Sequence, residues 1–140
     1  MSRVINPDST GKERTRLTKA IVLSIRGLAK QADVSEESRD MAAFIALALK
    51  KIAAGIDTSV AAWEKRDYWV KADRFRMEWA WAAALGDSLE AALLSDDWTE
   101  VAVISSQIAQ NLSKVKVSDR HRMGTPWSGA YSKLVEADRG

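Results

Sequence analysis

The sequence predicts an all-α fold, a four-helix bundle with a short additional helix at its carboxy terminus. Only two prolines and seven glycines interrupt the 140 residues, which favours helix over strand. Apolar residues recur three and four positions apart in several long segments, the spacing of a buried helical face. With 46% hydrophobic and 29% charged residues, the chain has the balance of a globular protein, and we expect one domain over residues 1–140.

The first two helices are expected over about residues 12–31 and 36–54. Residues 7–11 predict a turn with capping side chains ahead of the first helix. The buried stripe of the first helix consists of Leu17, Ile21, Ile25, Leu28 and Ala32. Ser35 is placed to cap the second helix. Residues 55–58 predict its end and a new start, because a glycine there is followed by capping residues.

The third helix is expected over residues 59–85, with an extension to 94 left open at Gly86. At about 100° per residue, its large side chains fall on two roughly opposite sides. One side carries Val60, Trp63, Val70, Met77 and Trp81, and the other carries Ala61, Tyr68, Ala72, Phe75 and Trp79. Such a helix must be covered on both sides. Either it is the central helix of the bundle, or its own chain covers one side and a partner covers the other. We expect it to be central, with Trp63 and Trp81 largely buried.

The fourth helix is expected over residues 98–115, after a boundary at residues 95–97. Asp97 and Glu100 have the spacing of a capping box. The helical pattern stops over residues 116–125, and Pro126 suits the first position of a short final helix over residues 126–137. We expect this helix to dock on the bundle through Trp127, Tyr131 and Leu134.

Composition and motifs restrict the function. Without cysteine, the chain cannot form disulfides or thiolate metal sites, which suits a cytoplasmic location. The amino terminus lacks the apolar core of a secretory signal, and no run of about 18 apolar residues predicts a membrane span. The single histidine, His121, lies outside the long helices, which argues against a di-metal site. No phosphate loop or nucleophile elbow occurs. We therefore expect no catalytic residue, metal or cofactor, and the sequence favours a non-enzymatic role.

The leading hypothesis is a small helical protein-interaction module, which binds another protein or itself through an aromatic-bearing helix face. Trp69 lies near the centre of neither side of the third helix, close to Lys65 and Arg76. Trp69 is therefore the best candidate for an exposed partner contact, with Lys65 and Arg76 beside it.

The alternative hypothesis is nucleic-acid binding through the outer face of the first helix. Five basic residues lie within about 80° of one another on that face: Lys12, Arg16, Lys19, Arg26 and Lys30. Glu13 is the only acid in the expected helix, whereas surface helices normally mix charges of both signs. This face could bind phosphates, extended by Lys114, Lys116, Arg120 and Arg122. It could instead be a solvated face whose neutralising acids lie on a neighbouring helix.

Overall fold

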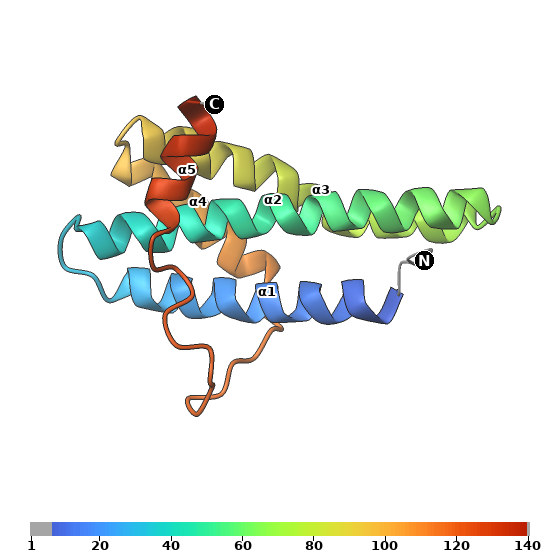
Figure 1. The fold of residues 1–140 in the computed structure, drawn as a ribbon, viewed down its shortest axis with the longest axis horizontal. Coiled ribbons are helices and arrows are strands. Elements are labelled where there is room, and N and C mark those ends of the chain that lie inside the picture. Colours follow the sequence, from blue (N-terminus) through green and yellow to red (C-terminus); the bar gives the residue numbers. More distant parts are fainter. Residues whose placement is uncertain (1–6, 140) are drawn as a thin grey trace.

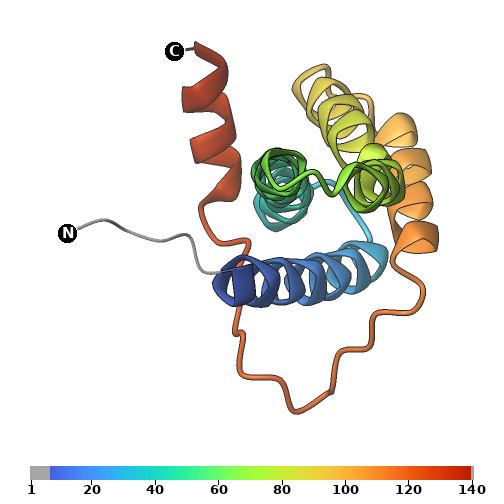
Figure 2. The ribbon, with the colours of Figure 1, turned by 90° about the vertical axis from the view of Figure 1, so that its right-hand side faces the viewer.

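The computed structural model describes residues 7–139, which form five helices and no strand. The helices are α1 (Pro7–Ala29), α2 (Glu36–Lys65), α3 (Trp69–Leu94), α4 (Trp98–Asn111) and α5 (Ala130–Arg139). Helix α2 packs against α1, α3 and α5, and α3 also packs against α4 (Figure 1). Viewed along the long axis, α2 has neighbours on three sides (Figure 2). The expected all-α bundle with a short carboxy-terminal helix is confirmed.

The α2–α3 hairpin corrects the expected third helix. Helix α2 continues through Gly55 to Lys65, and the chain reverses at residues 66–68. The predicted stop at residues 55–58 is therefore wrong, and residues 59–85 are divided between two antiparallel helices (Figure 1). A glycine inside a helix costs only about 1 kcal/mol. The buried side chains of Ile52, Ile56 and Val60 continue the apolar stripe past it and stabilise the longer helix.

Backbone hydrogen bonds close the turn between α2 and α3. The N–H of Tyr68 donates to the carbonyl of Trp63 at 2.9 Å, and the N–H of Asp67 donates to Glu64 at 3.1 Å. With Asp67 at a φ of 63°, this is a Schellman motif. The end of α3 repeats the motif at Asp96, whose φ is 57°. Both positions usually take glycine, so neither turn has the ordinary sequence signal.

Helix α3 runs unbroken through Gly86 to Leu94, which settles the extension that the sequence left open. A Cβ atom added at Gly86 would lie 3.2 Å from the Cβ of Leu49. Glycine therefore allows α2 and α3 to approach closely at this level. The ammonium group of Lys50 on α2 also contacts the Glu90 carboxylate on α3 and lies 3.9 Å from that of Asp87.

Each helix contributes to one contiguous core. The fully buried side chains include Ile21 of α1, Leu49 of α2, Leu89 of α3, Ile108 of α4 and Leu134 of α5. Because α2 touches three of the other helices, it carries the longest run of buried residues. Burial of these large side chains is the main stabilising contribution to the bundle.

The other helix ends agree in part with expectation. The Ser35 hydroxyl accepts a hydrogen bond from the N–H of Ser38 at 3.1 Å, as predicted for the cap of α2. The carboxylate of Asp97 accepts from the N–H of Glu100 at 3.1 Å at the start of α4. Helix α1 begins earlier than expected, because residues 7–11 continue the helix instead of forming a turn. Helix α4 ends at Asn111, earlier than the expected residue 115.

The carboxy-terminal helix docks on α2, as expected, although it begins at Ala130 rather than at residue 126. Leu134 is fully buried and Trp127 is nearly so. The carboxylate of Asp40 on α2 accepts hydrogen bonds from the N–H groups of Gly129 and Tyr131 at 3.1 and 2.9 Å. A side chain of α2 thus caps the start of α5 and fixes its orientation.

Candidate interaction surfaces

Helix α3 presents apolar side chains on the side that faces away from the core. Its core side carries Ala72, Phe75, Trp79 and Ala82. Opposite them lie Val70 and Met77, which are 68% and 78% exposed. The same outer side, within about 100° of arc at 100° per residue, holds the apolar residues that we call the outward stripe: Val70, Met77, Ala80, Trp81 and Ala84. Asp73, which pairs with Arg76, lies within the same arc.

The outward stripe corrects the expected burial of the third helix. Val70, Met77 and Trp81 share one side, as the periodicity indicates, but Val70 and Met77 are exposed and only Trp81 packs partly against the core. Trp63 was expected on the same stripe but belongs to α2. The turn at residues 66–68 separates it from α3, so the spacing of 100° per residue cannot be counted from one helix into the other. Trp63 and Trp81 are both partly buried and not enclosed. Towards the hairpin tip, α3 is therefore covered by its own chain on one side only.

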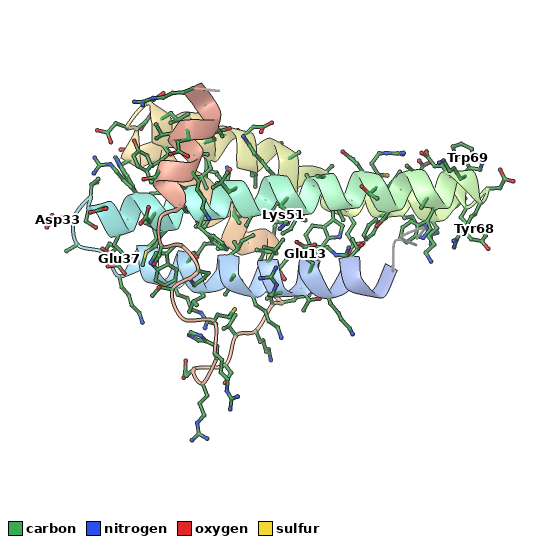
Figure 3. The ribbon with its side chains drawn as sticks, in the orientation of Figure 1. Glu13, Asp33, Glu37, Lys51, Tyr68 and Trp69 are labelled. Atoms are coloured by element: carbon green, nitrogen blue, oxygen red, sulfur yellow. The ribbon has the colours of Figure 1, made fainter. Side chains whose placement is uncertain are left out.

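The tip of the hairpin adds exposed aromatic residues next to this stripe. Tyr68 and Trp69 are each 54% exposed and lie at the far end of the α2–α3 hairpin (Figure 3). They line a shallow depression with Asp67, Val70 and Lys71. The expected exposure of Trp69 is confirmed, and its role as a partner contact stays a prediction.

The two cations expected beside Trp69 differ in their surroundings. The Arg76 guanidinium lies 2.9 Å from the Glu64 carboxylate and 2.6 Å from that of Asp73. The hydrogen bond that Arg76 donates to Glu64, with the one that it donates to Asp73, raises the pKa of Arg76 above its ordinary value. Arg76 therefore braces α3 against α2, and Lys65 is exposed in the last turn of α2. Helical spacing did not predict the Arg76–Glu64 ion pair, because the two residues lie on different helices that the hairpin turn brings together.

Aromatic contacts also join the two arms of the hairpin and α1. The rings of Trp63 on α2 and Phe75 on α3 meet edge to face with centroids 4.9 Å apart. The ammonium group of Lys71 lies 4.6 Å from the centroid of Trp63. From α1, the Arg14 guanidinium lies 5.0 Å from the centroid of Phe75. The Lys71 contact joins the two arms of the hairpin, and the Arg14 contact holds the hairpin against α1.

The basic residues expected on the outer face of the first helix are all exposed: Lys12, Arg16, Lys19 and Arg26 on α1, and Lys30 directly after its end. Among the described side chains of residues 10–139, none of these five forms an ion pair with an acid. Glu13 instead pairs with Lys51 of α2 at 2.9 Å (Figure 3). The hydrogen bond and charge of Lys51 lower the pKa of Glu13. Neutralising acids on a neighbouring helix, the other interpretation of this face, are thus not found among these side chains.

The segment between α4 and α5, residues 112–129, passes beside α1 (Figures 1 and 2). Arg26 donates a hydrogen bond to the carbonyl of Val117 at 3.2 Å and so attaches this segment to α1. An open groove of about 380 Å³ lies between them. Lys12, Arg16 and Lys19 line one wall, and Lys116, Ser118 and His121 line the other. We call this the basic groove.

The structure brings together only some of the expected anion contacts. Lys12, Arg16, Lys19 and Lys116 share the basic groove, whereas Arg26 and Lys30 do not line it. Lys114, Arg120 and Arg122 are exposed in the same 112–129 segment but are not among the lining residues. Sequence reasoning missed Ser118 and His121 as neighbours of α1, because the path of an irregular segment depends on tertiary contacts.

Comparisons with known proteins add no relative: no protein-family model, curated protein or solved structure matches the chain. Within residues 7–139, no helix is both long enough and apolar enough to cross a membrane. In the same part of the chain, no three acidic or histidine side chains are grouped so that they could hold a metal ion. The outward stripe and the basic groove are therefore the surfaces from which function is inferred.

Proposed function

We propose that this protein is a small cytoplasmic protein-interaction module, and that the outward stripe of α3 binds the same stripe of a second copy. The exposure of Val70 and Met77, directly opposite the core side of α3, carries the proposal. Exposed apolar residues on a monomer are usually scattered. Here they recur seven residues apart along one line with Ala84, the spacing of a helix–helix seam.

Self-association is favoured because the stripe is complementary to itself. Two α3 helices that pair antiparallel about Met77 form a closed two-fold interface. At helical spacing, this arrangement places Trp69 and Val70 of one copy opposite the small Ala84 of the other. It also places Arg74 beside Glu78 and Trp81 of the other copy. Large side chains thus meet small ones, and a cation meets an acid and an aromatic ring.

The size of the stripe sets the expected affinity. From Val70 to Ala84 the stripe is about 21 Å long, at about 1.5 Å per residue. One helix pair of this length buries less than the roughly 800 Å² per partner of a standard interface. We therefore expect a transient dimer with a dissociation constant in the micromolar range, and not an obligate one.

Sedimentation velocity over a range of protein concentrations tests this proposal. The mass of the wild-type protein should rise from that of one 15.5 kDa chain towards twice that value. The Met77→Glu variant should remain monomeric, because it buries a charge at the two-fold axis. Val103→Glu is the matched control, since Val103 is 45% exposed on α4, outside the stripe. A wild-type mass that stays at one chain, or equal dimerisation of both variants, would reject the proposal.

A charge swap tests the antiparallel arrangement itself. Arg74→Glu and Glu78→Arg should each weaken the dimer, because each places like charges opposite one another across the interface. The double variant should restore dimerisation, since it exchanges the two charges in both copies. Far-ultraviolet circular dichroism checks that each variant keeps its helix content. Failure of the double variant to recover would exclude this register.

A further inference from the structure

We propose that the basic groove between α1 and residues 112–129 binds the phosphate backbone of duplex nucleic acid. The site differs from the outward stripe, because none of its lining residues belongs to α3. Lys12, Arg16 and Lys19 form one wall, Lys116 lies on the other, and no acid lines the groove. Backbone phosphates are bound chiefly by lysine and arginine side chains, which displace the counterions of the nucleic acid.

The charge of the whole chain is distributed unevenly around this groove. The formal net charge is only +2, yet nine of the 21 basic residues lie on the outer face of residues 12–30 or in residues 112–129. In sequence, Glu13 and Asp119 are the acids of residues 12–30 and 112–129, and Glu13 is already paired with Lys51. The rest of the chain carries more acids than bases. One side of the protein therefore attracts polyanions, although the whole is nearly neutral.

Length favours a polymer over a small anion. On α1 the cations of the groove span Lys12 to Lys19, and the exposed Arg26 and Lys30 continue the row beyond the groove to just past the end of α1, about 27 Å in all at 1.5 Å per residue. This distance corresponds to about eight phosphates of one strand at 3.4 Å spacing. The groove is open, and its cations lie on exposed side chains and not in an enclosed pocket. A row of exposed cations of this kind can follow the phosphate backbone of a nucleic acid.

The chemistry of the lining favours duplex over single strands or membranes. No tryptophan, tyrosine or phenylalanine lines the groove, and its one aromatic ring is the imidazole of the partly buried His121. The groove therefore lacks the row of large aromatic side chains on which successive unpaired bases stack. Its apolar lining residues, Val117 and Met123, are buried and partly buried, so the groove exposes little apolar surface to insert among lipid chains. Contacts limited to phosphates do not distinguish base sequences. The expected binding is therefore independent of sequence and sensitive to salt.

Fluorescence anisotropy with a labelled DNA duplex of about 20 base pairs, longer than the roughly eight that α1 spans, measures this binding. The wild-type protein should bind at low salt. With four phosphate contacts, the log–log salt slope should be about −3.6, so affinity should fall about a hundredfold between 50 and 200 mM salt. Binding that hardly changes with salt, or no binding at the lowest salt, would overturn the proposal.

Variants on each wall test whether the groove acts as a unit. The double variant Arg16→Glu/Lys19→Glu should bind at least about tenfold more weakly, and Lys116→Glu should weaken binding although α1 is unchanged. Lys65→Glu/Lys133→Glu is the matched control, because it changes the net charge equally at exposed residues outside the groove. Equal loss in this control would show that only net charge matters. Binding to vesicles that contain phosphatidylserine, without binding to DNA, would assign the groove to lipid headgroups instead.

Discussion

Asp67 holds a backbone conformation that residues other than glycine rarely adopt, with a φ of 63°. Aspartate tolerates this region better than most residues, since its short side chain can hydrogen-bond locally. At this position it allows α2 to end and α3 to begin within residues 66–68. The direction of the whole hairpin therefore depends on one residue.

Substitutions at Asp67 should separate backbone strain from side-chain chemistry. Asp67→Val should cost about 1–2 kcal/mol, because a β-branched residue is strained at this φ. Asp67→Gly should melt at or above the wild-type temperature, since glycine adopts this conformation freely. Asp57→Val is the control, at an exposed position within α2. Thermal melts followed by circular dichroism measure all three, and an Asp67→Val melt equal to that of the wild type would contradict the assigned turn.

At the level of elements, α5 and α2 stabilise each other. Leu134 of α5 is fully buried, and Asp40 of α2 accepts the hydrogen bonds that start α5. The apolar surface of α2 needs this cover, because α1 and α3 leave that side of α2 open (Figure 2). We therefore expect α5 to unfold together with the bundle and not to behave as a detachable tail.

The Leu134→Ala variant tests this coupling. Removing a fully buried leucine side chain should lower the free energy of unfolding by about 2–5 kcal/mol. Glu136→Ala, at an exposed position of the same helix, should change it by less than about 0.5 kcal/mol. Urea unfolding measures both. A Leu134→Ala protein as stable as the Glu136→Ala control would show that α5 contributes little to the fold.

Periodicity predicted the helical class, most of the buried stripes and the docking of α5, because each depends on local spacing. The sequence could not locate the α2–α3 turn, where Asp67 takes the place of the expected glycine, and Gly55 suggested a break where α2 continues. Treating residues 59–85 as one helix placed Trp63 on the same side as Val70 and Met77. That side was therefore predicted to be buried, although Val70 and Met77 are exposed. Trp69 and the basic residues of α1 were identified because exposure follows directly from position on a helix.

At the level of the whole molecule, the two proposed surfaces use different physical forces. The outward stripe is mainly apolar, so dimerisation should depend only weakly on salt. The basic groove is lined by cations, so binding of nucleic acid should depend steeply on salt. A dimer formed through α3 would carry two basic grooves, and a long duplex that reached both would be bound more tightly than by one. The response to salt therefore distinguishes the two proposed activities, and on a duplex too short to reach both grooves they can be varied separately.

We propose that the exposed side of α3 forms a seam between two copies, and a single introduced cysteine probes that seam at its two-fold axis. The chain has no cysteine, so a Met77→Cys protein can form a disulfide only with another copy. If α3 pairs antiparallel about this residue, the two thiols meet at the two-fold axis, where a disulfide can form. Under mild oxidation, most of the Met77→Cys protein should run as a covalent dimer on non-reducing gels, and the Val103→Cys control should remain largely monomeric. Equal cross-linking of the two proteins, or none at Met77→Cys, would contradict the account.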